Sequence, residues 1–101
     1  MDLRIFKYEL RVTDRQILKL PIDRKILHVD NQRGSLCLWV LLDNDQPLIS
    51  DCEIEIIGTG NPLPYDRWEV RNHIGSVIID PFVWHVFEIK SAANPGFELF
   101  A

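Results

Sequence analysis

The sequence lacks any cluster of basic residues. Its 11 Lys and Arg are scattered among 15 Asp and Glu, which gives a formal net charge of −4. Tight binding to duplex nucleic acid depends on clustered positive charge that displaces counterions from the phosphates. The composition therefore argues against duplex nucleic acid as a partner and favours a soluble protein with an acidic surface.

Long apolar runs are also missing, since none approaches the roughly 18 residues of a membrane-spanning helix. The first ten residues, MDLRIFKYEL, alternate charged and apolar side chains, unlike a signal or transit peptide. We therefore expect a cytoplasmic protein with no membrane partner.

Cysteine is scarce, with only Cys37 and Cys52 present. A symmetric turn over residues 43–46 would place the two opposite each other on neighbouring strands, which suggests a disulfide. Strand pairs suit that bond poorly, and the cytosol is reducing. We therefore prefer two buried thiols that act as small hydrophobic groups.

No stretch of ten residues shows sustained helical periodicity. Alternation of apolar and polar residues predicts strands at 4–12, 16–20, 25–31, 34–43, 49–57, 73–79 and 82–90. In the first of these, Phe6, Tyr8, Leu10 and Val12 share one face, which predicts a half-buried strand. Residues 34–43, GSLCLWVLLD, are apolar on both faces and predict a central strand that is covered on both sides.

Seven short strands separated by turn residues indicate an all-β fold. We expect a small antiparallel β-sandwich or a partly open barrel of six to eight strands. At most one short helix is expected, between residues 62 and 71. Residues 1–90 are predicted to form a single domain and residues 91–101 a C-terminal tail. We also expect a homo-oligomer, because an edge strand such as residues 4–12 seeks a partner.

Motifs of metal and catalytic sites are absent from the sequence. The histidines, His28, His73 and His85, form no H-E-x-x-H pattern, and neither a C-x-x-C pair nor a nucleophile elbow is present. We therefore expect no metal, no cofactor and no catalytic residue. Five acidic residues near one turn fit a solvated sheet face better than a calcium loop; they are Asp43, Asp45, Asp51, Glu53 and Glu55.

The most distinctive stretch is a glycine- and proline-rich break at residues 58–66, GTGNPLPYD. Gly58 and Gly60 permit close approach of a ligand, and successive N–H groups in such a turn form an anion-binding concavity. The hydroxyl of Thr59 and the amide of Asn61 would add directed hydrogen bonds. The GK[ST] ending of a phosphate-binding Walker loop is missing. An ordinary loop that needs glycine for its shape is the alternative.

Two aromatic residues beside this loop, Tyr65 and Trp68, are candidates for stacking on a ring or anchoring a partner. His85 follows Trp84 on a predicted strand and is either a partly buried, hydrogen-bonded histidine or a contact to an anionic ligand. The predicted ligand-binding set is Gly58, Thr59, Gly60, Asn61, Tyr65, Trp68 and His85.

Three short pieces carry a resemblance to a known family: CLW at residues 37–39, GTG at 58–60 and HVFE at 85–88. With them, residues 3–90 resemble a family of small domains of unknown function that occur mainly in bacteriophage and prophage genomes. In the family pattern a histidine often follows the second glycine of the GTG turn. Here Asn61 stands there, which argues against a proton-transfer role for the loop.

The resemblance implies a phage origin, and small phage proteins without motifs often bind a host component. We therefore expect a non-enzymatic accessory protein that binds and blocks a host factor in the host cytosol, as an anti-defence inhibitor. One alternative is a sponge that sequesters a nucleotide-type signal at an oligomer interface, with the glycine loop on the phosphates. A structural virion component is the second alternative.

Overall fold

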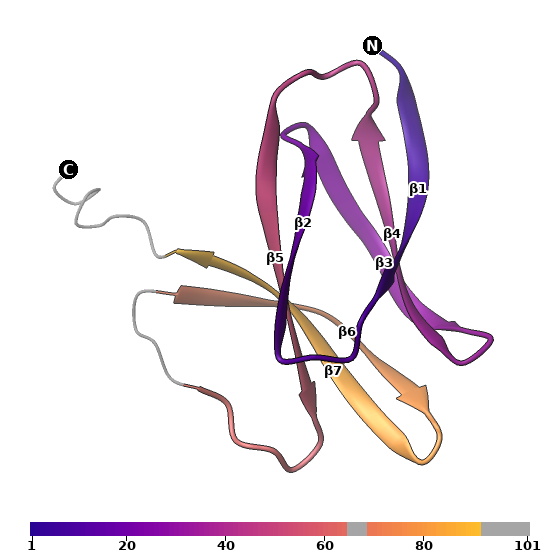
Figure 1. Cartoon of the computed structure of the whole chain (residues 1–101), viewed down its shortest axis with the longest axis vertical. Coiled ribbons are helices and arrows are strands. Elements are labelled where there is room, and N and C mark those ends of the chain that lie inside the picture. The colour runs from indigo at the N-terminus through magenta and orange to yellow at the C-terminus, as the bar shows by residue number, and fades with distance from the viewer. Residues whose placement is uncertain (65–68, 92–101) are drawn as a thin grey trace, which may run out of the picture.

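The computed structural model describes residues 1–64 and 69–91. They form seven strands in chain order (Figure 1): β1 Leu3–Leu10, β2 Arg15–Pro21, β3 Arg24–Gln32, β4 Ser35–Asp43, β5 Ile49–Gly58, β6 Glu69–Ile79 and β7 Phe82–Ser91. The predicted all-β class is confirmed. No helix lies within these residues, and therefore none that is long and apolar enough to cross a membrane.

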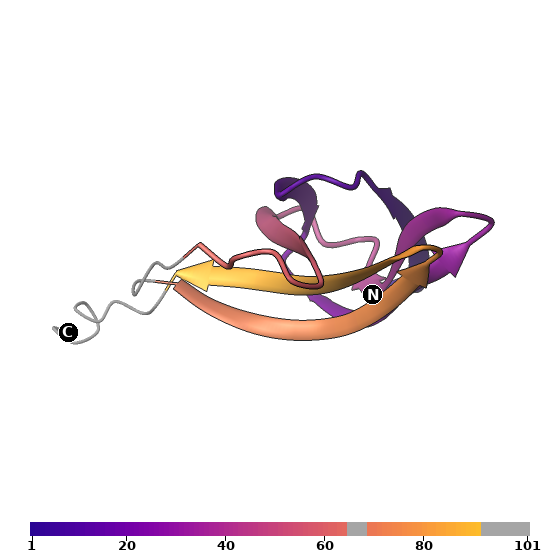
Figure 2. The ribbon, with the colours of Figure 1, turned by 90° about the horizontal axis from the view of Figure 1, so that it is seen from below.

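The strands form two antiparallel sheets. Sheet A has the order β1-β4-β3, and sheet B has the order β2-β5-β7-β6. The two sheets are not joined into a closed barrel. In Figure 2 the long β6–β7 ribbon curves beneath the strands of the N-terminal half.

The predicted strand positions agree with the structure to within one or two residues, except in β6. This strand begins at Glu69, so the helix suggested for residues 62–71 is replaced by strand over Glu69–Arg71. β3 and β4 are joined by a two-residue hairpin turn in which Arg33 and Gly34 have φ of 55° and 87°. Positive φ at both positions is the preferred geometry for a tight hairpin.

β4 is the central strand of sheet A, as predicted. Its core-facing residues Leu36, Leu38, Val40 and Leu42 are at most 2% exposed. Coverage of the opposite side was also predicted, and it is only partial. Cys37 is buried there, but Trp39 and Leu41 remain half-exposed because the described strands of sheet B pack on one side of sheet A alone.

β4 and β5 do not form a hairpin. The segment between them crosses from sheet A to sheet B, so Cys37 and Cys52 do not face each other, and both are free, buried thiols. This corrects the predicted pairing and confirms the preferred alternative. Burial and the charge of Glu88 raise the pKa of the Cys52 thiol to about 11, which keeps it protonated and unreactive near neutral pH.

β1 lies at an edge of sheet A, as the oligomer expectation requires. Its predicted half-buried face is buried only at one end. Leu10 is buried and Tyr8 is half-buried, whereas Phe6 and Val12 are exposed. The strand therefore extends beyond the core that it helps to cover.

Sheets A and B approach each other most closely where β3 crosses β6. A Cβ atom at Gly75 would lie 2.9 Å from Cγ1 of Val29. Glycine at this position therefore lets the two strands touch, and a β-bulge between His73 and Gly75 bends β6 at the same place. A pocket lies beside this crossing.

Candidate functional site

The glycine loop uses much of its hydrogen-bonding capacity within the protein. Gly58 ends β5, and Gly60 has φ of 90°. The N–H of Asn61 donates to the carbonyl of Gly58 over 3.0 Å, and the N–H of Thr59 donates to the carbonyl of Val83 over 3.2 Å. Both N–H groups already have backbone acceptors, so the loop offers an anion fewer donors than its sequence predicts.

Thr59 and His85, predicted separately, lie together in the structure. Oγ1 of Thr59 lies 2.7 Å from Nε2 of His85, and Oγ of Ser76 lies 2.7 Å from Nδ1 of the same ring. Nε2 of His73 is 3.1 Å from Oγ of Ser76 and extends the chain of hydrogen bonds. Because both ring nitrogens of His85 are engaged, the half-buried imidazole is fixed in orientation.

The other loop residues lie on the opposite face of sheet B. Trp84 and His85 are adjacent in β7 and therefore point to opposite faces. A Cβ atom at Gly58 would lie 3.1 Å from the ring of Trp84 and 2.9 Å from Nδ2 of Asn61. Gly58 and Asn61 line a hollow of about 320 Å³ with Trp84. The predicted set is thus divided between two faces, and Tyr65 and Trp68 lie outside the described residues.

A network of charged side chains on β2, β5 and β6 covers the outer face of sheet B, which is the face that carries His85. Nε of Arg71 donates to Glu55 over 2.6 Å, and Nε of Arg15 donates to Glu55 over 3.2 Å. Arg15 also holds both carboxylate oxygens of Glu69, at 2.7 and 2.8 Å. Glu55 is 1% exposed. The expectation of a solvated acidic face is therefore wrong for Glu55, whose charge is balanced by two half-buried arginines.

This network also holds the loop. Nη2 of Arg71 donates to the carbonyl of Pro64 over 2.6 Å and ties the end of the described loop to sheet B. The hydrogen bonds from Arg15 lower the pKa of the Glu69 carboxyl, so this carboxylate stays ionised at neutral pH. We interpret the network as structural, because every acidic group in it has an arginine partner.

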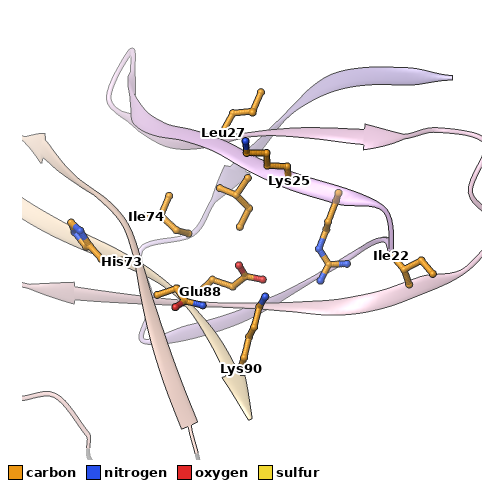
Figure 3. A pocket seen from close by; sticks show the side chains of 10 residues that line it. Ile22, Lys25, Leu27, His73, Ile74, Glu88 and Lys90 are labelled. Carbon is orange, nitrogen blue, oxygen red and sulfur yellow. The ribbon is translucent and has the colours of Figure 1, made fainter. Parts of the chain in front are cut away.

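The strongest candidate for a ligand site is the pocket between β3 and the β6–β7 ribbon (Figure 3), with a volume of about 450 Å³. Three of its lining residues are basic, namely Arg24, Lys25 and Lys90, and one is acidic, Glu88. In a chain with a net charge of −4, this is a local excess of positive charge. Such a pocket attracts anions.

The basic residues of the pocket differ in whether the fold holds their side chains. Nη1 of Arg24 donates to Oγ of Ser50 over 2.8 Å and to the carbonyl of Pro21 over 3.0 Å, so this side chain is fixed by the fold. Lys90 extends into the pocket in Figure 3. Ile26 and Ile74 supply apolar wall. A fixed guanidinium, an exposed ammonium and apolar walls suit a ligand that carries both an anionic group and a flat apolar face.

Comparison with known proteins places the chain in a family. The family model described as a domain of unknown function (DUF7352) matches residues 1–96. The chain belongs to the DUF7352 family. The match runs beyond the resemblance predicted for residues 3–90 and includes all seven strands of this DUF7352 domain. No curated protein and no solved structure matches it.

The sequence interpretation of this DUF7352 domain missed Ser76, although the gap at residues 80–81 between two predicted strands contained the signal. Counting outward equally from that gap places Ser76 opposite His85, as the structure has it. Asn72 lies opposite Glu88 only because the bulge near Gly75 shifts the register by one residue. No local sequence pattern predicts that bulge. Within residues 1–64 and 69–91 no group of three or more His, Cys, Asp or Glu is placed to hold a metal ion.

Proposed function

We propose that the protein is a non-enzymatic binding protein that sequesters a small anionic ligand of the nucleotide type. The observation that carries this proposal is the basic pocket between β3 and the β6–β7 ribbon. Its volume of about 450 Å³ lies within the usual range for small-molecule sites. Lys90, which extends into the pocket, would neutralise phosphate, and the apolar walls would contact a base or ribose.

The pocket lies apart from the glycine loop, which the sequence predicts as the phosphate-binding segment. Two N–H groups of that loop are used inside the fold, and the hydroxyl of Thr59 contacts His85. The resemblance to phage and prophage domains supports a role in a host cytosol, where holding a nucleotide signal would silence a defence response. The free edge of β1 supports assembly of two or more copies.

The proposal predicts that nucleotides stabilise the protein. At a concentration about a hundredfold above the dissociation constant, a ligand that binds only the native state adds about 2.7 kcal/mol to the free energy of unfolding. Thermal unfolding with nucleoside monophosphates measures this gain, and chromatography should recover the nucleotide unchanged. Lys90→Glu should abolish the gain, whereas Lys7→Glu, the same charge change on β1, should preserve it. Equal binding by the two variants would contradict the pocket assignment.

A second candidate is a protein that binds and blocks a host protein. It is favoured by the outer face of sheet A, the side of β4 that carries Trp39 and Leu41. The register brings Ile5 beside Leu41 and His28 beside Trp39, and Ile5 is 58% exposed. Exposed apolar residues around a tryptophan are typical of a protein-binding hot spot.

If this second candidate is right, a host protein co-purifies with the chain from lysate. The Trp39→Ser variant should no longer capture that protein. Ile17→Ser is the matched control, because Ile17 is an exposed apolar residue on sheet B. Capture that survives Trp39→Ser would exclude the outer face of sheet A as the contact surface. Native mass spectrometry of the purified protein separates the two candidates, since a retained small molecule favours the pocket and a retained protein favours the sheet.

A further inference from the structure

Asn72 and Glu88 form a cross-strand pair within the basic pocket. They lie directly opposite each other on β6 and β7, and both line the pocket. Directly opposed residues have Cβ atoms about 4.5–5.5 Å apart, so an amide and a carboxylate stand side by side on one wall. In Figure 3 the side chain of Glu88 extends into the pocket.

The polar atoms of this pair are largely unused by the described part of the chain. The contact recorded for the Glu88 carboxylate is with Sγ of Cys52, at 3.8 Å. A thiol is a weak donor. Within residues 1–64 and 69–91, Glu88 forms no ion pair and the amide of Asn72 forms no hydrogen bond. A half-buried carboxylate that faces a cavity in this way favours a ligand that brings its own donors.

The pair presents a definite pattern of hydrogen-bonding groups. An ionised carboxylate accepts through both oxygens, and an asparagine amide donates through its NH₂ group. With the NH₂ group of Asn72 turned toward the ligand, the wall offers two acceptors beside one donor. Guanine has the complementary edge, with the N1–H and the N2 amino group as adjacent donors and O6 as the acceptor beside them.

We propose that the pocket selects guanine nucleotides, with Glu88 accepting from N1–H and the N2 amino group and Asn72 donating to O6. This inference rests on the proposed function, because it assigns the base specificity of the same pocket. Lys90 then lies toward the phosphate, and Ile26 and Ile74 contact the faces of the base.

The other bases leave part of this wall unpaired. Adenine and cytosine place a ring nitrogen with a lone pair beside their amino group, and that lone pair would face a carboxylate oxygen. Uracil offers one N–H between two carbonyl oxygens, and one of these oxygens would face the carboxylate. Hypoxanthine keeps N1–H and O6 but lacks the amino group, so it should bind with intermediate affinity.

Calorimetric titration of the full chain with GMP, IMP, AMP and CMP tests the assignment on the unmodified protein. GMP should bind about ten- to a hundredfold more tightly than AMP or CMP, the discrimination expected of one bidentate base contact. IMP should lie between them. Glu88→Gln should remove the preference for GMP over AMP, so that the two affinities become equal within a factor of about three, because the amide cannot accept from both N1–H and the N2 amino group. The loss of one negative charge should raise the affinity for AMP, because the lone pair of adenine N1 no longer faces a carboxylate oxygen. Glu9→Gln, on exposed β1, should keep the preference for GMP.

The outcomes separate the two proposals. Binding of all four nucleotides with equal affinity would overturn the guanine assignment and leave the anion-binding pocket standing. No binding of any nucleotide would overturn both. A preference for GMP that persists in Glu88→Gln would show that another group reads the base, and this would overturn the role of Glu88.

Discussion

Replacement of Glu55 by alanine is expected to lower the free energy of unfolding by about 3 kcal/mol, the lower end of the range for breaking a buried ion pair. Glu55 is 1% exposed and accepts hydrogen bonds from Arg15 and Arg71. Its removal leaves the Arg71 guanidinium, whose side chain is 17% exposed, without its closest carboxylate. The cost arises because the charge of this arginine stays largely out of water with less compensation.

The matched control for this prediction is Glu53→Ala. Glu53 lies on the same strand and face but is 33% exposed, and its contact with Arg15 is 3.2 Å long. Ion pairs of that exposure contribute about 1 kcal/mol or less. Urea unfolding followed by tryptophan fluorescence measures both variants. Equal losses would mean that the network does not depend on the burial of Glu55.

The strands of this fold were predictable because most of the information lies in local alternation. In β5 the apolar positions repeat every two residues, β4 is an unbroken apolar run, and Gly34 marks a tight turn with positive φ. These features depend on neighbouring residues only. For this reason the strand boundaries agree with the structure almost everywhere outside β6.

The pairing of strands was less predictable. The segment DNDQP between β4 and β5 has the composition of a hairpin turn, yet it crosses between the sheets. Turn residues fix where the chain reverses and do not fix which strand becomes the hydrogen-bonded neighbour. Cys37 therefore lies between Glu9 and Asp30 in sheet A, and Cys52 lies opposite Leu18 in sheet B.

The candidate site was likewise predictable only in part. Thr59 and His85 were each predicted from the chemistry of a loop or strand, and the pairing of β5 with β7 brings them together. The basic pocket was not predicted, because Arg24 and Lys90 are far apart in the sequence and meet only where β3 packs against the β6–β7 ribbon. No motif marks a site that is assembled from two sheets.

A pair of substitutions in β4 tests which of its two faces stabilises the fold. In the sequence, Leu38 and Leu41 are equivalent members of one apolar run. In the structure Leu38 is fully buried between the sheets, whereas Leu41 is half-exposed on the outer face of sheet A. Leu38→Ala leaves a cavity in the core and is expected to lower the free energy of unfolding by about 3–4 kcal/mol.

Leu41→Ala is the control, with an expected loss of about 1 kcal/mol, because less apolar surface is removed from contact and no enclosed cavity forms. Urea unfolding gives both values under the same conditions. If Leu41→Ala costs as much as Leu38→Ala, the outer face of sheet A must be buried in the native protein, as it would be against a second copy of the chain. The same measurement repeated over a range of protein concentrations then identifies that copy, because the stability of an associated state rises with concentration.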